Sequence, residues 1–575
     1  MHSNNLNHST NYCPFLFDGA EGRLDKVTDR IQELFRDARA AGGVSFAVFH
    51  DATTIKLDHI GYRNLSERQV ANADTRYPIN SMTKGMVAVL AGIADHEGKL
   101  DFDCPVRHYL ERFKSSEAVV QDHATVLDFL AHRTGIAGND IFWIGSQNTV
   151  YLDRKELLVS FSTLKKIGPF RTTFSYNNWG YEIVALVLES VYGKELSTLL
   201  EEKIFLPLGM SRSGTNWDNE GNEISAYAVL QDGSPKKIER PQLNKGILME
   251  AAGGVKSSIH DLLIYYKAFT YAVNDQFSNN SDETTGSIFK NLRTIVGAQI
   301  SFPGQPGLRE QSYAGGWVRC QLPGPLGRVG LNPCYAEMPI IGNGSPSRLD
   351  LYHQGLMPGS LSVVHVLPET KVGIIVLQNS TAPNDTADLI SQEILQTLYR
   401  HQNPVDFVAF AQDITKKSFA AMEKVQRQLD EKRGNRPPGK YRDYKGTYWN
   451  GVENFRIDIL ECDRALKMRF QGMDSEVYDL NHYDGDTFSW LASHDETVSR
   501  GRLLASEPSY FLIRFIREGK RVVSISWCWS EFLPAVEEVF KKGKESEKAS
   551  SIQRLQQILR SGAKKAAHFF DCLHR

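Results

Sequence analysis

Ser81 and Lys84 are the residues of this sequence whose types and spacing most directly suggest chemistry. They stand three positions apart in the stretch 77–86, where a turn with Pro78 precedes an apolar helical pattern. Residues three apart share one helix face, so the lysine amine can reach the serine hydroxyl. A serine becomes nucleophilic when a base takes its proton, and burial lowers the pKa of a lysine toward that of a useful base. The pair therefore predicts an acyl-accepting serine.

The spacing alone is weak evidence, because Ser-x-x-Lys recurs at Ser162/Lys165, Ser234/Lys237, Ser287/Lys290 and Ser561/Lys564. A serine that caps a helix ahead of a surface lysine would look the same. What distinguishes Ser81 is its position at the start of an apolar helix. There its hydroxyl and the free N–H groups of the first turn face outward together.

A second candidate group lies at 174–180, just before another apolar helical pattern. If this segment is extended, Tyr176 and Asn178 project to the same side and face one cavity. A tyrosine beside a cation loses its proton more readily and can act as a base. Asn178 offers a donor and an acceptor to a substrate amide or carbonyl. The alternative is a core tyrosine followed by a helix-capping asparagine.

A third group, His353, Gly355 and Leu356, lies at the end of an expected strand. A glycine there lets a backbone approach a substrate closely, and a strand-edge N–H can bind an oxyanion. His353 can donate a hydrogen bond to the tyrosine or to a substrate carboxylate. A lone histidine at a strand end is more often structural.

The elements that must position these residues follow from hydrophobic periodicity. A helix is expected at 23–41, strands at 44–50 and 53–61, and a mostly helical region from 124 to 269, followed by a solvated loop at 273–286. Strands at 361–367 and 372–378 flank a hairpin turn, and a helix at 386–399 closes the region. Sheet elements separated by a helical block predict an α/β fold.

Beyond the linker around Pro437 and Pro438 the pattern changes to seven short strands between 446 and 529, which predict a small antiparallel β-barrel. The expected domains are a flexible leader (1–22), a catalytic domain (23–402), a helical linker (403–440), the barrel (441–540) and a helical tail (541–575).

Composition narrows the function classes. The 575 residues carry a net charge of -2, so no electrostatic attraction to nucleic acid or to an acidic membrane is expected. The first residues lack the apolar segment of a secretory signal, and the seven cysteines are scattered rather than clustered. These features predict a cytoplasmic protein with reduced thiols. They leave the oligomeric state open.

Taken together and in order, Ser81-Met82-Thr83-Lys84, Tyr176-Asn177-Asn178 and His353-Gln354-Gly355 resemble the three motifs of the serine β-lactamase and penicillin-binding-protein superfamily. The chain is similar to the class C, esterase and D-aminopeptidase branch over roughly 23–400, including the turns at 207–210, 251–254 and 315–317. The resemblance implies a β-lactamase-like sheet flanked by helices, with a helical subdomain. Region 441–540 resembles the lipocalin-like barrel often appended to this branch.

The resemblance also implies a two-step acyl transfer on a small-molecule substrate. Ser81 would attack a carbonyl while Lys84 and Tyr176 move its proton, and the N–H groups of Ser81 and Leu356 would hold the oxyanion. Asn178 and His353 would position substrate and tyrosine. This mechanism needs no metal or other cofactor.

Three departures from the family pattern narrow the expected substrate. His353 replaces the lysine of many relatives, Gln354 replaces a hydroxyl residue that helps hold a carboxylate, and Leu356 replaces a small residue. They argue against β-lactam hydrolysis, and the missing export signal argues against work on a cell wall. Because esterases and acyltransferases of this branch are common in specialised metabolism, the resemblance implies an ester, lactone, thioester or amide of a small natural product rather than peptidoglycan. Transfer of the acyl group to an alcohol or amine is an alternative with the same acyl-enzyme. A catalytically silent binding or scaffold protein is an alternative of a different class.

Overall fold

A computed structural model of the chain describes residues 20–218, 221–304, 308–504, 507–529 and 537–543. Most of the expected leader and of the expected tail lies outside these residues. The chain divides into two units. The catalytic unit contains the described residues up to Glu431 together with the segment Leu491–Pro508, and the second unit contains most of the remainder.

The catalytic unit is built on an eight-stranded antiparallel sheet of order β2-β1-β14-β13-β12-β9-β8-β7. Its strands are β1 (Gly43–His50), β2 (Thr53–Gly61), β7 (Ile300–Ser301), β8 (Gln311–Tyr313), β9 (Val318–Leu322), β12 (Arg348–Met357), β13 (Ser360–Leu367) and β14 (Val372–Gln378). The central strands β13 and β14 are buried along their whole length. In β13 this burial includes the polar residues Ser360, Ser362 and His365. The predicted β13–β14 hairpin is confirmed, and the strands expected at 44–50 and 53–61 also pair with each other, as β1 and β2.

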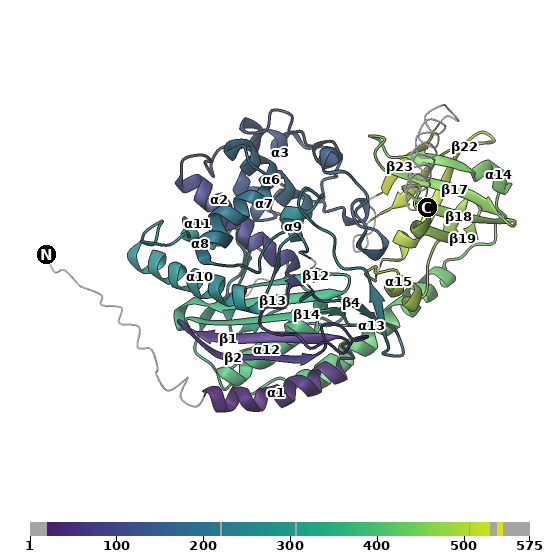
Figure 1. Cartoon of the computed structure of the whole chain (residues 1–575). Helices are drawn as coiled ribbons and strands as arrows, with labels where there is room; N and C mark the ends of the chain where they lie inside the picture. Colours follow the sequence, from purple (N-terminus) through teal and green to yellow (C-terminus); the bar gives the residue numbers. More distant parts are fainter. Residues whose placement is uncertain (1–19, 219–220, 305–307, 505–506, 530–536, 544–575) are drawn as a thin grey trace, which may run out of the picture. The chain divides into compact units, whose positions relative to one another are not determined.

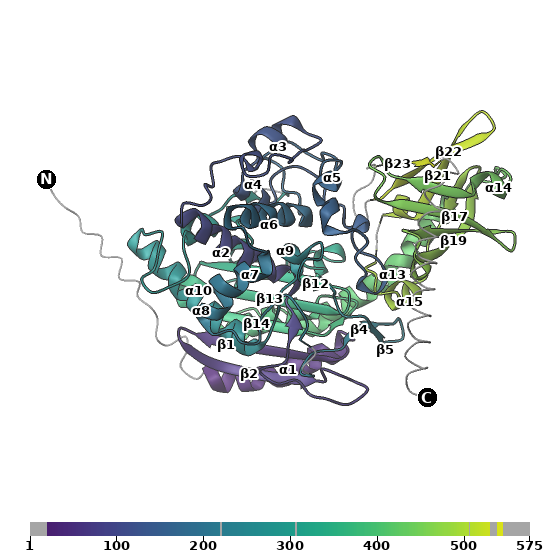
Figure 2. The ribbon, with the colours of Figure 1, turned by 45° about the horizontal axis from the view of Figure 1, so that its top comes forward.

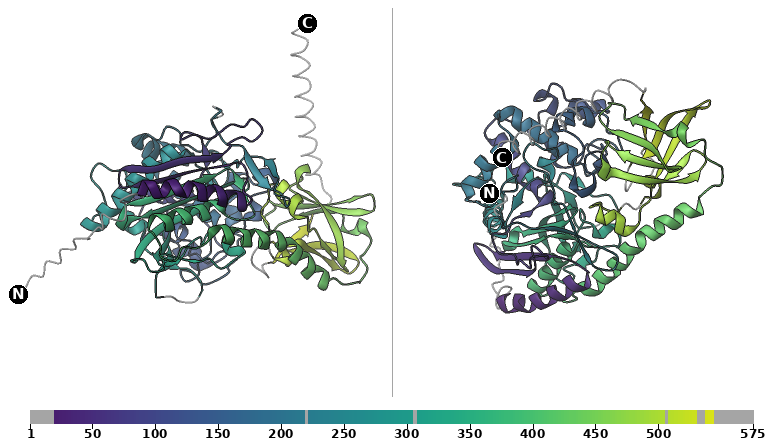
Figure 3. Two further views of the ribbon diagram at one scale, coloured as in Figure 1. Left: turned by 90° about the horizontal axis from the view of Figure 1, so that it is seen from below. Right: turned by 45° about the vertical axis from the view of Figure 1, so that its right-hand side comes forward.

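Helices cover both faces of this sheet (Figure 1). On one face α12 (Thr386–Leu398) packs on β13 and β14, and α1 (Ala20–Asp37) packs on α12; both are seen from below in Figure 3. On the other face α10 (Ile259–Asn279) contacts β1, β13 and β14. The apolar stripes of α1 and α12 join the inner sheet residues in one core. The expected α/β arrangement, a sheet flanked by helices, is confirmed.

The helical subdomain lies beside the α10 face of the sheet (Figure 2). Its members are α2 (Thr83–His96), α3 (Ala118–His123), α4 (Val126–Leu130), α5 (Leu157–Phe161), α6 (Asn178–Tyr192), α7 (Leu196–Leu200), α8 (Leu206–Leu208), α9 (Glu250–Gly253) and α11 (Leu292–Ile295). Helices α2, α6 and α9 contact one another, which brings residues far apart in the sequence together at the candidate site.

The expected solvated loop at 273–286 is partly wrong, because α10 continues to Asn279. Val273 and Gln276 on its last turns are buried, and the Gln276 amide donates to Phe289 O at 2.9 Å. Tertiary packing thus extends a helix through a sequence rich in Asn and Asp. The helix ends where Asn280 adopts a left-handed conformation.

The second unit contains a closed barrel of eight antiparallel strands, formed by β16 (Gly446–Trp449), β17 (Arg456–Cys462), β18 (Ala465–Phe470), β19 (Val477–Asp484), β20 (Thr487–Ser489), β21 (Leu512–Glu518), β22 (Arg521–Cys528) and β23 (Glu537–Lys542). A barrel was expected, but with seven strands. The last strand, β23, includes residues 541 and 542, which were expected to begin a helical tail; pairing with β22 and β16 closes the barrel instead.

Smaller elements complete the described chain: α13 (Phe407–Glu431), α14 (Tyr441–Tyr444), α15 (His494–Ser499), β3 (Tyr77–Pro78), β4 (Ala226–Val229), β5 (Pro235–Ile238), β6 (Lys256–Ser257), β10 (Gly324–Pro325), β11 (Ile340–Ile341) and β15 (Ser380–Thr381). Among the described helices, none combines the length and the apolar character needed to cross a membrane.

Candidate active site

The candidate nucleophile stands in a short 3₁₀ turn, Asn80–Met82, that leads directly into α2. Asn80 has a left-handed backbone (φ 50°), a conformation that asparagine tolerates better than most residues. Its side-chain amide donates to Ser360 Oγ at 3.0 Å, which ties the turn to β13. The left-handed residue just before Ser81 fixes the direction in which the serine leaves the turn.

Lys84 lies within hydrogen-bond distance of Ser81. Its Nζ is 2.9 Å from Ser81 Oγ and donates to the backbone carbonyl of Ala252 at 2.7 Å. The side chain is fully buried, and this burial lowers the pKa of Lys84 to about 7, although the carboxylates of Asp140 and Glu182 oppose the shift. A neutral amine is therefore available near neutral pH to accept the serine proton.

Tyr176 completes the group, but with a different protonation than the sequence suggested. Its hydroxyl hydrogen-bonds with Ser81, and Lys84 Nζ lies 5.0 Å from the centre of its ring. Burial raises the pKa of Tyr176 above its usual value, and this effect outweighs the hydrogen bond from Ser81. The expectation that a neighbouring cation makes the tyrosine a ready base is wrong for the resting state. Tyr176 is a neutral phenol, and Lys84 is the better base.

An aromatic cluster lies behind Tyr176 and Lys84. The ring of His132 packs on that of Tyr176 with centroids 4.2 Å apart and the ring planes tilted by 37°, and Lys84 Nζ lies 5.3 Å from the centre of the Tyr181 ring. Tyr313 hydrogen-bonds to His353 Nε2 at 2.9 Å. Such surroundings exclude water from the amine, which is the physical cause of the lowered pKa of Lys84.

His353 belongs to this cluster rather than to the substrate surface. It is 1% exposed, and its Nδ1 hydrogen-bonds to the backbone carbonyl of Gln354. Burial, and then the charge of Lys84, lower the pKa of His353 to about 3, so the imidazole is neutral. The structure places it behind Tyr176, with ring centroids 6.3 Å apart. This differs from the expected contact with a substrate carboxylate, which a neutral buried ring cannot attract.

Asn178 is the first residue of α6 rather than part of an extended segment, and the capping residue is its neighbour Asn177. Its amide donates to both carboxylate oxygens of Asp140 at 3.1 Å, and Trp143 Nε1 donates to the same carboxylate at 2.6 Å. Asp140 therefore fixes the amide so that its oxygen faces away from the carboxylate. No spacing in the sequence indicated Asp140.

The third group lies on β12, in the part of this strand that does not pair with β9. The pairing with β9 ends at Tyr352, so that edge is open from His353 to Met357 within the described chain. Gly355 is required there for a different reason than expected. A Cβ on it would lie 2.5 Å from Ile79 O and 2.3 Å from Ser362 Oγ, so the close approach is made by the chain that precedes Ser81.

These residues surround one cavity of about 280 Å³. Of the predicted site residues Ser81, Tyr176, Asn178 and Leu356 line it, whereas Lys84, His353 and Gly355 lie behind the lining. Residues that the sequence did not indicate also line it: Asp140, Trp143, Leu331, Met357, Leu503 and Leu504. The lining is mostly apolar, as is usual for small-molecule sites.

Comparison with known proteins shows the family to which the chain belongs. The family model described as "Beta-lactamase" matches residues 29–399, and a "Domain of unknown function (DUF3471)" matches residues 430–542. The chain belongs to the beta-lactamase family. The resemblance seen in the sequence is confirmed for this family, whereas a lipocalin-like character of the closed barrel stays a prediction.

Named relatives in the beta-lactamase family are distant. The unguisins hydrolase of Aspergillus violaceofuscus is 25% identical over 59% of this chain and 58% of its own length. A beta-lactamase of Providencia stuartii is 24% identical over 65% of this chain and 91% of its own, and a D-aminopeptidase of Cereibacter sphaeroides is 27% identical over 44% and 47%. The chain thus spans little more than half of the unguisins hydrolase.

A solved structure with the same fold is the octameric penicillin-binding protein homologue from Pyrococcus abyssi. It matches with a TM-score of 0.52 and 17% identity, over 90% of this chain and 100% of that one. At this identity the match supports the fold alone.

Proposed function

We propose that this protein is a serine-dependent hydrolase that forms an acyl-enzyme with an ester, lactone, thioester or amide of a small molecule. The observation that carries the proposal is the buried Lys84, whose pKa is lowered to about 7 and whose Nζ lies 2.9 Å from Ser81 Oγ at the cavity wall. A cavity slightly below the usual range of about 300–1,000 Å³ fits a small substrate.

In the proposed acylation step, Ser81 Oγ bonds to the substrate carbonyl carbon and its proton passes to neutral Lys84. The carbonyl oxygen takes the negative charge, which the N–H groups of Ser81 and Leu356 stabilise. As the tetrahedral intermediate collapses, the bond to the leaving alcohol, thiol or amine breaks. The proton returns to that group through the Tyr176 hydroxyl. In deacylation, water attacks the same carbon, loses its proton along the same path and releases Ser81.

The relatives support hydrolysis over a silent binding role, because the proteins that match over this domain include a hydrolase, a beta-lactamase and D-aminopeptidases. The intact Ser81, Lys84 and Tyr176 geometry supports the same choice. Transfer to an alcohol or amine, rather than to water, would use the same acyl-enzyme, and product analysis with a competing alcohol separates the two outcomes.

The test is detection of the acyl-enzyme by intact mass after mixing with p-nitrophenyl butyrate, together with burst release of p-nitrophenol. Ser81→Ala should abolish both. The chain offers a matched control in Ser287→Ala, since Ser287 also stands three residues before a lysine, but Lys290 there pairs with Glu283 at 2.9 Å. The control should behave like the wild type. A Ser81→Ala variant with an unchanged burst would overturn the proposal.

A further inference from the structure

The described part of the segment 491–504, called here the inserted segment, stands in the sequence between strands β20 and β21 of the barrel but folds as part of the catalytic unit. It contains α15 and ends with Gly501, Arg502, Leu503 and Leu504, which line the same cavity as Ser81 and Tyr176. Nothing in the sequence of the first 402 residues indicates that residues 501–504 line this cavity, because they belong to a distant part of the chain.

Specific contacts hold the inserted segment on the catalytic unit. Gln147 donates from its backbone N–H to Arg500 O and from its side chain to Ser499 O, both at 2.7 Å. The N–H of Gln231 donates to the Asp495 carboxylate at 2.7 Å. Val498 packs on the small cluster of Ala226, Ala228 and Ile238 from β4 and β5. These contacts fix a backbone that short-range sequence preference would leave as a loop.

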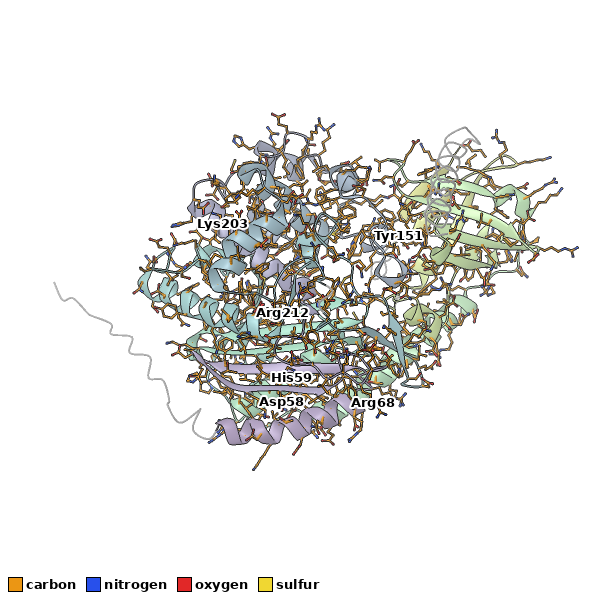
Figure 4. All side chains as sticks on the ribbon, viewed as in Figure 1. Asp58, His59, Arg68, Tyr151, Lys203 and Arg212 are labelled. Atoms are coloured by element: carbon orange, nitrogen blue, oxygen red, sulfur yellow. The ribbon has the colours of Figure 1, made fainter. Side chains whose placement is uncertain are left out.

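The inserted segment also contacts the turn at 146–148, which lies close in sequence to the lining residue Trp143. Gln147 and Asn148 both have left-handed backbones, which is unusual for two consecutive non-glycine residues. The Asn148 amide donates to Pro358 O at 2.9 Å, and Arg502 donates to the hydroxyls of Ser146 and of Tyr151, which is labelled in Figure 4. Trp143, just ahead of this strained turn, lines the cavity. The inserted segment therefore sets the position of two cavity walls.

We propose that the inserted segment selects the substrate: Leu503 and Leu504 form the surface against which an aliphatic acyl group lies while its carbonyl carbon reacts with Ser81. This inference rests on the proposed function for its chemistry but on the cavity alone for its geometry. Both leucines are partly buried and join Leu331, Leu356 and Met357 in an apolar lining. An apolar lining stabilises each buried methylene of a ligand by about 0.8 kcal/mol, so it favours longer chains until the wall is reached.

The experiment compares kcat/KM for p-nitrophenyl butyrate, octanoate and dodecanoate. Leu504→Trp should lower kcat/KM for octanoate about tenfold while butyrate changes little, since losing the burial of about two methylenes corresponds to about that factor. Leu504→Ala, which carries less risk of misfolding, should raise the ratio of dodecanoate to octanoate. Leu206→Trp is the matched control, because Leu206 lies in the catalytic unit with 67% of its surface exposed. Unchanged chain-length profiles in both Leu504 variants would overturn the inference.

A second measurement separates this inference from the proposed function. If the wild type hydrolyses none of the esters, the ester branch of the proposed function fails. Calorimetric binding of octanoate to the Ser81→Ala protein then tests the role of Leu503 and Leu504 without any reaction. Adding Leu504→Trp in that background should weaken octanoate binding about tenfold. Equal binding with and without the tryptophan, or no octanoate binding at all, would overturn the inference.

Discussion

The carboxylate of Glu182 accepts a hydrogen bond from the backbone N–H of Ala251 at 2.6 Å. The next residue, Ala252, supplies the carbonyl that accepts from Lys84 Nζ at 2.7 Å. Glu182 on α6 therefore positions, through α9, the acceptor that holds the candidate base on α2. Burial raises the pKa of Glu182 to about 7, while Arg154, 3.4 Å away, favours its charged form.

Glu182 also acts on Lys84 by its charge, which opposes the lowering of the lysine pKa by burial. Glu182→Gln keeps an oxygen for the Ala251 N–H but removes that charge. The pKa of Lys84 should then fall further, and since only the neutral amine is a base, the acidic limb of kcat/KM should move to lower pH by about half a unit to one unit. A pH–rate profile with p-nitrophenyl butyrate measures the shift.

The charged groups around Glu182 allow a matched control. Arg154 contacts the carboxylates of both Glu182 and Glu189. A third carboxylate near Glu182 is that of Glu250, which lies next to Ala251 on α9. Glu189→Gln removes a carboxylate from the same arginine but not from the surroundings that shift the pKa of Lys84. Its profile should match the wild type. If Glu182→Gln also leaves the acidic limb in place, Glu182 has no part in setting the base.

Tyr176→Phe should lower kcat by about 10²- to 10³-fold, because it removes the hydroxyl that passes the proton to the leaving group. KM should change little, and the acidic limb should remain near the pKa of Lys84, about 7. Tyr181→Phe is the control: that hydroxyl donates to Leu130 O at 2.6 Å and does not line the cavity. It should cost about 1 kcal/mol of stability and leave kcat intact. Wild-type kcat in Tyr176→Phe would remove the tyrosine from the mechanism.

Local features of this site were predictable from sequence, and long-range ones were not. The approach of Lys84 to Ser81 follows from helical spacing, and the β13–β14 hairpin follows from two apolar runs around a turn. The contact of Glu182 with Ala251 joins residues 69 positions apart. Hydrophobic periodicity in the sequence does not indicate such a contact, since the contact depends on how α6 packs on α9.

Burial explains the remaining differences. A histidine at a strand end has the same local sequence whether it faces substrate or lies behind a tyrosine, and His353 lies behind Tyr176. A neighbouring cation lowers the pKa of a tyrosine, but burial acts in the opposite direction, and in Tyr176 burial is the largest effect and raises the pKa. Leu503 and Leu504 follow strand β20 of the barrel in sequence, yet they line the cavity of the catalytic unit.

Gly355→Ala should lower the free energy of unfolding by about 2–3 kcal/mol, because the added methyl would overlap Ile79 O and Ser362 Oγ. Urea unfolding measures the change. Gly214→Ala is the control, since a methyl there meets only Arg76 Nη2 at 3.7 Å. Combining Gly355→Ala with Ser362→Gly should recover part of the loss. Equal stability of Gly355→Ala and wild type would show that the strand can shift away from the turn.

Asp385 and Asp388 form a buried acidic pair at the start of α12, beneath the cavity residue Gln354. Asp385 caps the helix by accepting from the Asp388 N–H at 3.1 Å, and Asp388 accepts from the amides of Gln354 and Gln392, both at 2.9 Å. Burial, and then the charge of Asp388, raise the pKa of Asp385 to about 8. The folded protein therefore keeps a proton on Asp385 that the unfolded chain releases above about pH 4.

Because the carboxyl pKa is raised in the folded state, the contribution of this proton to stability is full below about pH 4 and is lost progressively as the pH rises toward 8. Asp385→Asn mimics the protonated form and caps a helix equally well. It should be more stable than the wild type by about 2 kcal/mol near pH 8, with the gain shrinking toward pH 4, as measured by urea unfolding. Asp388→Asn should be less stable at both pH values, because its carboxylate accepts from three side-chain amides, those of Gln354, Gln392 and Asn332. A loss of stability in Asp385→Asn near pH 8 would mean that Asp385 is charged in the folded protein.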